Sequence, residues 1–489
     1  MKVKSRRGVS RRGFLVATAA APVFASRAVL GQTQKESKTM FVTVPEQRVP
    51  VLAECDVLVC GGGTSGITAA VSAARHGASV VLLERWPMIG GMATAALVTG
   101  WHRSDREKMV IYGLVEETAQ RAFKHGWIWK DGGFPRVHET HWFEPEGMKI
   151  VYHDMLDEAK VRTFCYTVAG EPIVEGGRIR GVLADTKQGR RAVLAKIVVD
   201  ATGDGDVAAK AGVPFEFGRA SDGRVQGMTM MYRVCNIDEA KVRSFPPDKA
   251  RAVMEAMRAA SKAGELPPFN HAFSLGQAHN RAIPNMCPVA GNPLDEEELT
   301  RLTITGRRQV HAYWDWLRTR VPGLEKVQIE QTGMSLGIRE SRRIKGLKTL
   351  DAAMILGTVK QPDAIGHGIW MIDIHDPLGT GYTTWNDRGA KSMVPVGKSY
   401  HIPLGMCLNA TVPNLAVAGR CASSTHEGHS SVRVQTHCMV MGQGVGTAAA
   451  MALAAGCDLA QVNIPALQAA LKKDGVYLED VPAQGARKG

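Results

Sequence analysis

Two short runs of apolar residues near the start of the chain predict its first secondary-structure elements. Residues 57–60 are Val-Leu-Val-Cys, which is typical of a strand buried on both faces, and residues 79–83 contain a second run, Val-Val-Leu-Leu. Residues 65–75, between these runs, are rich in Ala and Val and predict a helix. A strand, a helix and a second strand in this order predict a βαβ unit with parallel strands.

The turn after the first predicted strand carries the pattern G-x-G-x-x-G at Gly61, Gly63 and Gly66. Gly61 permits the tight turn, Gly63 lets the backbone approach a pyrophosphate, and Gly66 lets the helix pack closely on the strand. The helix N-terminus offers free N–H groups and partial positive charge to phosphates. Glu84, at the end of the second strand, can accept hydrogen bonds from a ribose. The unit predicts a dinucleotide site and leaves NAD and FAD open.

The pattern beyond this unit predicts a small meander, an insertion and a return to the first domain. Short strands at 174–179, 181–184 and 192–197 are separated by turns and predict a β-meander on the nucleotide domain. From 215 to 395 a strand at 228–234 and helices at 250–263 and 294–320 indicate a substrate or cap domain. Strands at 400–404 and 414–420 and a helix at 435–455 follow. The fold class is therefore α/β, a Rossmann-like domain of parallel sheet plus β-meander with an inserted α+β domain.

The charge of the chain does not favour a nucleic-acid partner. The formal net charge is +13, but residues 1–31 hold seven Lys or Arg and no acid, which leaves about +6 for the remainder. After residue 31 there is no basic run with interleaved aromatic residues. At 45% hydrophobic residues the chain can bury a large core.

The first residues resemble a twin-arginine export signal. Residues 10–15 are Ser-Arg-Arg-Gly-Phe-Leu, and a modestly apolar stretch follows at 16–25. Cleavage after either Ala25 or Ala28 fits a small-residue rule, and the alternative is an uncleaved basic tail. The resemblance implies export of a folded protein by the twin-arginine machinery to the periplasm.

The cysteines and the apolar segments agree with a protein that is folded before export. The nine cysteines show no C-x-x-C and no metal-ligand spacing, which favours small apolar core residues over disulfides. The apolar stretch at 16–25 is too short to span a bilayer. The later stretch at 440–455 is broken by Gln443 and glycines, so we predict no integral membrane segment.

Three further features favour FAD over NAD. Glu84-Arg85 is followed by Gly90-Gly91, the strand at 199–204 ends in Ala-Thr-Gly-Asp, and 417–420 is Val-Ala-Gly-Arg ahead of a helix. Together they resemble the FAD-dependent oxidoreductases of the glutathione-reductase-related superfamily, nearest to the branch with succinate dehydrogenase, fumarate reductase and ketosteroid dehydrogenases. More narrowly, residues 50–460 are similar to a large bacterial family of FAD-dependent oxidoreductases.

The resemblance implies an FAD cofactor and a set of residues along it. Arg433 precedes a helix predicted from about Val434, and both would stabilise the anionic edge of reduced flavin. A solvated helix-end arginine is the alternative for Arg433. The implied FAD-binding residues are Gly61, Gly63, Thr64, Ser65, Gly66, Glu84, Arg85, Gly90, Gly91, Met92, Thr94, Ala201, Gly203, Asp204, Gly419, Arg420, Ser431 and Val432.

Four clusters compete for the substrate side of the flavin. They are His426 with His429, the segment 373–376 (Asp-Ile-His-Asp), the arginines in 339–343 and the pair Tyr400-His401. Alternation in 373–376 is typical of a strand end and places Asp373 and His375 on one face. A histidine that only packs, and an ion-pair network of the arginines with Glu340, are the structural alternatives; a metal site is not favoured. The candidate catalytic residues are His375, His426, His429, Arg433 and Arg339.

These features predict an exported FAD-dependent dehydrogenase that moves a hydride between a small polar organic substrate and flavin N5. A second G-x-G-x-x-G for a nicotinamide cofactor is absent, so a quinone, a cytochrome or oxygen is the expected electron acceptor. The alternatives are a flavin-dependent oxidase or hydroxylase that uses oxygen, and an electron-transfer flavoprotein subunit. The predicted order is a signal peptide at 1–31, a linker at 32–50, the FAD-binding domain at 51–214, the substrate or cap domain at 215–395, the return segment of the FAD-binding domain at 396–470 and a tail at 471–489.

Overall fold

The computed structural model describes residues 42–128, 140–269, 280–379 and 392–482. The chain divides into two units, Met1–Glu46 and Gln47–Gly489, and the fold described below is that of the second unit. The predicted signal peptide at 1–31, and most of the linker, lie outside the described residues.

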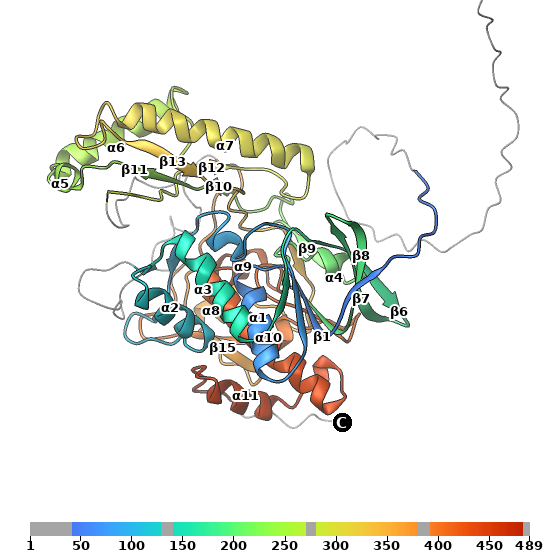
Figure 1. Ribbon diagram of the computed structural model, residues 1–489. Helices are drawn as coiled ribbons and strands as arrows, with labels where there is room; N and C mark the ends of the chain where they lie inside the picture. Colours follow the sequence, from blue (N-terminus) through green and yellow to red (C-terminus); the bar gives the residue numbers. More distant parts are fainter. Residues whose placement is uncertain (1–41, 129–139, 270–279, 380–391, 483–489) are drawn as a thin grey trace, which may run out of the picture. The chain divides into compact units, whose positions relative to one another are not determined.

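A parallel sheet forms the centre of the second unit (Figure 1). Its strands run in the order β5-β2-β1-β8-β17, with Val59 of β1 opposite Leu82 on one side and Val199 on the other. The apolar run at 57–60 is fully buried, as expected of a strand covered on both faces. The strands are β1 (Val51–Cys60), β2 (Val80–Leu83), β5 (Arg162–Phe164), β8 (Gly189–Asp200) and β17 (Leu415–Val417).

The predicted meander is present and shares a strand with the parallel sheet. β6 (Val168–Glu175) pairs with β7 (Arg178–Thr186), and β7 pairs with the first half of β8, in both cases antiparallel. The second half of β8 lies between β1 and β17. One long strand therefore carries the meander and ends at the carboxyl edge of the parallel sheet, where α/β folds bind ligands.

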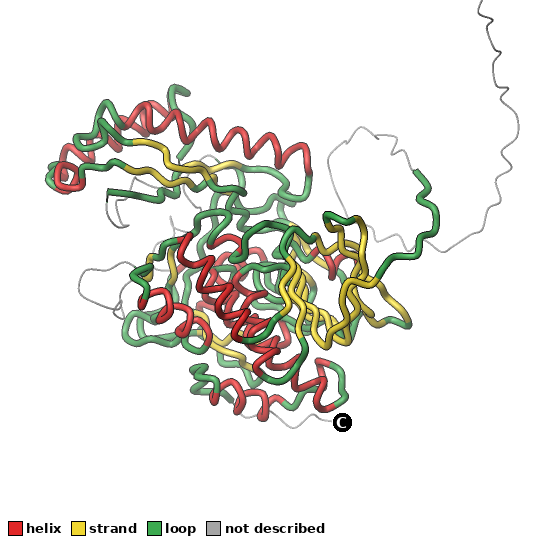
Figure 2. Tube along the Cα trace, in the orientation of Figure 1, coloured by secondary structure: helices red, strands yellow, loops and turns green. Residues whose placement is uncertain are grey.

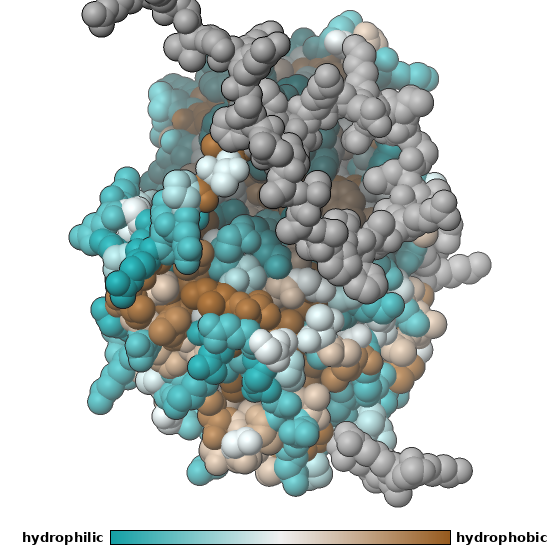
Figure 3. Space-filling model, turned by 90° about the vertical axis from the view of Figure 1, so that its right-hand side faces the viewer, coloured by the Kyte–Doolittle hydropathy of each residue, from teal (hydrophilic) through white to brown (hydrophobic). Residues whose placement is uncertain are grey.

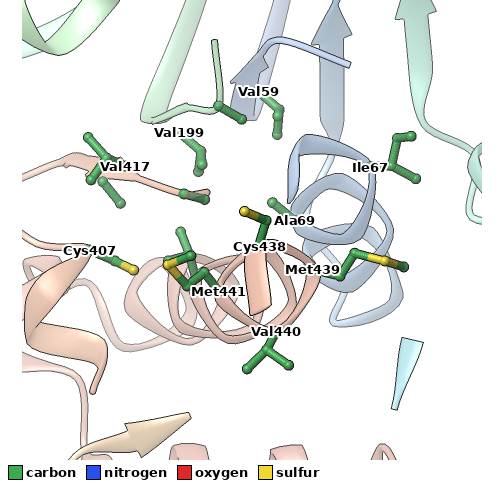
Figure 4. Packing of buried hydrophobic residues seen from close by; sticks show 14 of the residues in the cluster. Val59, Ile67, Ala69, Val199, Cys407, Val417, Cys438, Met439, Val440 and Met441 are labelled. Atoms are coloured by element: carbon green, nitrogen blue, oxygen red, sulfur yellow. The ribbon is translucent and has the colours of Figure 1, made fainter. Parts of the chain in front are cut away.

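Two helices pack against each other beneath the sheet, so closely that their backbones are in contact. An added Cβ at Gly442 of α10 (Gln435–Ala455) would lie 2.1 Å from the carbonyl oxygen of Ser65 in α1 (Thr64–Arg75). One at Gly446 would lie 2.2 Å from the carbonyl oxygen of Ala69. Figure 4 shows the two helices side by side, with apolar side chains of the sheet above them. Small residues thus let the helices approach closely.

α10 is long and apolar enough to cross a membrane by length and composition alone. In this fold 78% of its apolar window is buried inside the protein, which is typical of a core helix. All nine cysteines lie in the described residues and each is a free thiol, which confirms that these cysteines form no disulfide.

The insertion has a hydrophobic core of its own, which runs from Met228 to Ile338. Its helices lie along one side of four short strands (Figures 1 and 2). The long helix begins after Asp295, whose side chain accepts a hydrogen bond from the Glu298 amide. The elements are β10 (Met228–Met230), β11 (Tyr232–Cys235), β12 (Cys287–Val289), β13 (Gln328–Thr332), α5 (Glu239–Arg243), α6 (Pro247–Lys262) and α7 (Glu296–Leu317).

This second core is shorter than the predicted insertion at 215–395. Apolar residues from Ile344 to Val394 pack into the core of the nucleotide domain instead. The boundary was missed because apolar spacing shows that a residue is buried and does not show in which core. The segment 373–376 also lies outside the strands, although alternation predicted a strand end.

Shorter elements complete the nucleotide domain. Those before the insertion are η1 (Gly91–Ala93), β3 (Gly100–Trp101), α2 (Leu114–Lys124), β4 (His141–Trp142), α3 (Pro145–Glu158), α4 (Asp206–Lys210) and β9 (Phe215–Phe217). Those after it are β14 (Arg342–Ile344), α8 (Ala352–Leu356), β15 (Ala364–Gly368), β16 (Tyr400–Pro403), η3 (Leu404–Met406), α9 (His426–Val432), η4 (Leu459–Gln461) and α11 (Ile464–Lys473).

Figure 3 shows one face of the molecule, on which hydrophobic residues form a band between hydrophilic areas. Large apolar side chains are exposed on several different elements, among them Val168 of β6, Phe215 of β9 and Ile304 of α7. Exposed apolar residues that come singly from separate elements are normal for a folded protein.

Candidate functional site

The loop between β1 and α1 accepts only glycine at two of its three motif positions. Gly61 has a φ of +106°, and a Cβ there would lie 2.4 Å from the carbonyl oxygen of Ala201. A Cβ at Gly66 would lie 1.9 Å from the carbonyl oxygen of Gly61. At Gly63 the nearest atom to such a Cβ is 4.0 Å away, so this residue borders open space. Gly63 is also the N-cap of α1 and has no side-chain cap, which leaves the first helical N–H groups available to an anion.

Glu84 lies at the same end of the sheet, at the end of β2, and is only 5% exposed. Its carboxylate accepts hydrogen bonds from the amides of Gly62 at 2.7 Å and Trp86 at 2.8 Å. Burial raises the pKa of Glu84, although these amides and Arg85 act against that rise. The carboxylate is therefore fixed in place and retains lone pairs for a donor such as a ribose hydroxyl.

The N-terminus of α10 reaches the same region as that of α1, because the two helices cross at small residues. Its N-cap is Val434, which offers no side-chain cap. The preceding residue, Arg433, is 12% exposed. Two uncapped helix N-termini and a guanidinium thus concentrate positive potential at one place.

One cavity of about 690 Å³ connects these features. At one end it is bordered by Glu84, Arg85 and Trp86, and at the other by Trp370, Arg339 and His375. Residues of both cores form its wall, such as Leu83 and Ile338, together with Met231 and Ile283 of the insertion, which pack in a small separate cluster with Leu97. The hydrogen-bond donors and acceptors around the cavity fit FAD. They are the uncapped N-terminus of α1 at the glycine loop, the buried carboxylate of Glu84 and the uncapped N-terminus of α10.

Most of the predicted FAD-binding residues border this cavity, and the others do not. Thr94 donates a hydrogen bond to the carbonyl of Ile89, and Asp204 accepts hydrogen bonds from Arg420 and Ser341. Those on the cavity are Gly61, Gly63, Thr64, Ser65, Glu84, Arg85, Gly91, Met92, Ala201, Gly203 and Arg420. Those that do not border it are Gly66, Gly90, Thr94, Asp204, Gly419, Ser431 and Val432.

At the far end of the cavity the structure brings together four charged or titratable side chains. Asp373 lies between two of them, with its Oδ2 3.6 Å from Nε2 of His375 and 3.6 Å from Nη2 of Arg433. Arg433 also donates a hydrogen bond to the Asp373 carbonyl at 3.0 Å. Arg339 is the fourth member of this cluster. Asp373 and His375 do share a face, as predicted, although their segment is not a strand.

The charges in this cluster follow from burial and from their neighbours. Burial alone would raise the pKa of Asp373, but the hydrogen bond from His375 and the charges of Arg433 and Arg339 outweigh it and hold that pKa well below its usual range. Burial, and next the positive charge of Arg339, lower the pKa of His375 to about 3. At neutral pH the pair is therefore a carboxylate beside a neutral imidazole.

Arg339 is held by neutral groups of the insertion. One terminal nitrogen donates to the Gly227 carbonyl and the Thr229 hydroxyl, both at 2.8 Å, and the other donates to Oδ1 of Asn285 at 3.3 Å. Burial, and next the charge of Arg433, lower the pKa of Arg339 to about 9. These neutral oxygen atoms thus hold the guanidinium charge of Arg339 at the cavity wall.

His426 and His429 do not border the cavity, and this corrects the prediction that they meet the substrate. Nδ1 of His426 lies 2.8 Å from a carboxylate oxygen of Glu340, which also binds Arg343. His429 lies between the amide of Gln226 and the carbonyl of Arg420. α9 turns both side chains into the interior, and their closeness to Arg433 in sequence did not reveal this.

The other arginines of the segment 339–343 form the structural network that was the alternative prediction. Arg342 binds Asp206, and Arg343 binds Glu340 and the carbonyls of Ser424 and Gly218. His401, of the fourth candidate cluster, hydrogen-bonds backbone groups of Gln361. These side chains hold the wall of the nucleotide domain together.

Aromatic side chains at the substrate end were missed by the sequence interpretation. His102 stacks on Trp370, with ring centroids 4.0 Å apart, and Trp142 also borders the cavity. Burial lowers the pKa of His102 to about 4, so this ring is neutral. The aromatic and charged residues between 101 and 142 were the available signal, but their partner lies more than 200 residues away.

This geometry defines a Rossmann-like flavoprotein, with a dinucleotide cavity at the carboxyl edge of a parallel sheet that carries a β-meander. The family described as "FAD dependent oxidoreductase" matches residues 56–471. The chain belongs to this family and is an FAD-dependent oxidoreductase. The resemblance predicted from the motifs is confirmed at this level, and the narrower likeness to the succinate dehydrogenase branch stays a prediction.

Individual relatives resemble this chain more weakly. A fumarate reductase (cytochrome) of Shewanella frigidimarina is 31% identical over 86 residues, which are 17% of this chain and 14% of that protein. A geranylgeranyl bacteriochlorophyll reductase-like protein of Thermoplasma acidophilum is 17% identical, with 86% of this chain and 83% of the other covered and a TM-score of 0.41. For OxyS anhydrotetracycline hydroxylase of Streptomyces rimosus the identity is 12%, the coverages are 86% and 65% and the TM-score is 0.41.

Proposed function

We propose that the protein is an exported FAD-dependent dehydrogenase, which transfers a hydride between a small polar organic substrate and flavin N5. One observation carries this proposal: a single cavity joins the glycine loop and both helix N-termini to the cluster of Arg339, Asp373, His375 and Arg433. Bound FAD would supply the hydride chemistry. The protein must then bind the substrate, handle a proton and exclude water.

His375 is the residue best suited to hold the proton. Its Nε2 lies 3.6 Å from Oδ2 of Asp373, and this contact favours the tautomer that carries its proton on Nε2. Because the pKa of His375 is lowered to about 3, the imidazole is neutral at physiological pH; it is a weak base, and it takes up a proton only as Asp373 stabilises the imidazolium. Asp373 orients the ring and stabilises the imidazolium that results.

Arg433 and the N-terminus of α10 are suited to the flavin, and the insertion to the exclusion of water. Reduced flavin carries negative charge at its N1/O2 edge, which a helix N-terminus and a guanidinium stabilise. Met231, Ile283 and Ile338 bring apolar surface to the cavity from the side of the insertion. Such a wall keeps water away from the reacting atoms.

Anaerobic reduction of the purified, FAD-loaded protein tests the proposal. We expect one class of compound in a panel of sugars, organic acids and steroids to bleach the flavin absorbance without oxygen. A hydroxylase would instead keep its flavin oxidised until a reductant and oxygen are supplied. An electron-transfer subunit would stay oxidised with every compound and would be reduced only by a protein partner.

The electron acceptor is a separate part of the proposal. Because the sequence has no second G-x-G-x-x-G, a quinone or a cytochrome is favoured over a nicotinamide cofactor. After anaerobic reduction, we expect a soluble quinone analogue or cytochrome c to reoxidise the flavin faster than dissolved oxygen does. Faster reoxidation by oxygen, with release of hydrogen peroxide, would identify an oxidase.

Export by the twin-arginine machinery to the periplasm is also proposed, on the resemblance of residues 10–15 to that signal. Residues 1–31 fused to a reporter that must fold before export should carry it to the periplasm. The double substitution Arg11→Lys and Arg12→Lys should retain it in the cytoplasm. If the reporter that carries the double substitution is still found in the periplasm, export by this route is contradicted.

A further inference from the structure

Arg339 is a buried cation that, among the described residues, has no carboxylate in direct contact and shares the charge of Asp373 with Arg433. No carboxylate among the described residues lies within 4.0 Å of its guanidinium, and its three hydrogen bonds all go to neutral oxygens. Burial of a charge without a counter-ion is costly, as the lowered pKa of Arg339 also indicates. The residue borders the cavity, so an anion can reach it from there.

The charges around Arg339 do not balance within the cluster. Asp373 is nearest to Arg433 and His375, at 3.6 Å from each, and His375 is neutral at physiological pH. Two guanidinium groups therefore share one carboxylate. The substrate end of the cavity carries an excess of about one positive charge, and Arg433 is engaged with Asp373.

The wall beside this cluster is aromatic. Trp370 and His102 form their stack next to Asp373, whose Oδ2 lies 3.5 Å from the Trp370 indole nitrogen. Trp142 and the apolar Ile283 also border the cavity. Planar or aliphatic groups pack well on such a surface, and a second charged group would be desolvated there without a partner.

We propose that the substrate is a monoanionic carboxylic acid, whose carboxylate binds Arg339 and whose ring or hydrocarbon part lies against Trp370 and His102. The proposal rests on the proposed function, since it takes this end of the cavity as the substrate site. A neutral polyol would leave the charge of Arg339 unpaired. A dicarboxylate would bring its second negative charge towards Asp373 or the aromatic wall.

Isothermal titration of the oxidised, FAD-loaded full-length protein tests the charge requirement without turnover. The probes are benzoate, its neutral and cationic analogues benzyl alcohol and benzylamine, and the dicarboxylate succinate. We expect benzoate to bind at least tenfold more tightly than each of the other three. Equal binding of benzyl alcohol and benzoate, or tighter binding of succinate, would overturn the proposal.

Substitutions separate the anionic contact from the aromatic one. Arg339→Gln should weaken benzoate binding at least tenfold and leave benzyl alcohol unchanged, and Arg339→Lys should restore part of the affinity. Arg308→Gln, which removes an exposed cation of α7, is the matched control and should change neither. Trp370→Leu should remove the preference for benzoate over acetate. Retained flavin absorbance in each variant shows that the site is still formed, and unchanged benzoate binding in Arg339→Gln would refute the contact.

The binding experiment tests the anion site, and the turnover experiment tests the dehydrogenase function, so each claim can be wrong without the other. If benzoate binds through Arg339 and no acid reduces the flavin anaerobically, the anion site stands and the dehydrogenase function is wrong. If a neutral compound reduces the flavin and benzoate does not bind, the dehydrogenase function stands and the anion site is wrong.

Discussion

His375 and His426 have the same kind of neighbour but different surroundings, and we propose different roles for them on that ground. His375 and His426 each lie beside a carboxylate, but His375 borders the cavity, and Glu340 beside His426 is also bound by Arg343. The Asp373 carboxylate is farther from its histidine and can let the ring respond to a substrate. The Glu340 network is closed and holds α9 against the segment 339–343.

Substitution of His375 should therefore slow the chemistry, and substitution of His426 should not. We expect His375→Gln to lower the rate of anaerobic flavin reduction about 100- to 10,000-fold, because the proton acceptor is lost. His426→Gln should lower the thermal midpoint and leave that rate within about threefold. Stopped-flow absorbance and thermal unfolding measure the two effects, and equal losses of rate in both variants would contradict these roles.

The pH profile gives a second measure of the same residue. The pKa of a free histidine is about 6.5, and burial lowers that of His375 to about 3. The base therefore stays deprotonated as the pH falls from 8 to 5, and the rate of flavin reduction should be flat over that range. A fall centred near pH 6.5 would show that His375 is not the base, or that it is far more exposed than in this fold.

At the residue scale, sequence predicted those parts of the site that lie close together along the chain. Asp373 and His375 are two positions apart, and the alternation of the sequence placed them on one face, although the segment is not a strand. The stack of His102 on Trp370 joins segments 268 residues apart, and only the tertiary fold creates it. Local patterns also could not tell that Arg339 faces the cavity while Arg342 faces Asp206.

At the scale of elements, the crossing of α1 and α10 builds the site. Both helices were predicted nearly residue for residue, from a glycine motif for one and an apolar run for the other. Their crossing was not predicted, although Gly442 and Gly446 occur at the helical spacing of four that places both on one face. Because the helices touch at these glycines, their N-termini meet at one cavity.

Larger residues at the crossing should therefore loosen the cofactor as well as the fold. Gly446→Ala places a methyl group against a backbone carbonyl that cannot move away, and we expect a loss of about 1–3 kcal/mol in the free energy of unfolding. Gly442→Ala clashes with Ser65, which borders the cavity, and should also speed FAD release. Denaturant titration and flavin fluorescence measure the two quantities.

Ala454→Ser is the matched control for this pair, since it adds one heavy atom to an exposed position of the same helix. It should change neither stability nor FAD release by more than about 0.5 kcal/mol. If Gly446→Ala behaves like this control, the two helices do not touch as described.

At the scale of the whole molecule, the fold gathers many histidines in its interior in the neutral form. Burial is the largest cause of a lowered pKa in each of them, with values of about 2 to 4. They come from segments across both sides of the insertion: His102, His141, His367, His375, His401, His429 and His437. For Asp200 burial acts in the opposite direction and raises the pKa, to about 6.

These shifts fix the direction in which pH changes stability. The unfolded chain binds protons at its histidines as the pH falls below about 6.5, whereas the folded chain does not bind them until the pH approaches the lowered values. Stability is therefore complete above about pH 6.5 and is lost as the pH falls from there towards about 3. Each histidine contributes up to about 1.4 kcal/mol per pH unit, and Asp200 offsets about one of them between pH 6 and 4.

Between pH 7 and pH 5, the FAD-loaded protein should thus lose several kcal/mol of stability and take up several protons on unfolding. Scanning calorimetry in two buffers of different ionisation enthalpy measures that uptake directly. Ala454→Ser, at an exposed position of α10, adds no titratable group; it is the control and should leave the uptake unchanged. A thermal midpoint that is constant from pH 7 to pH 5 would mean that these histidines are hydrated or protonated in the folded protein, and would also remove the basis for His375 as a neutral base.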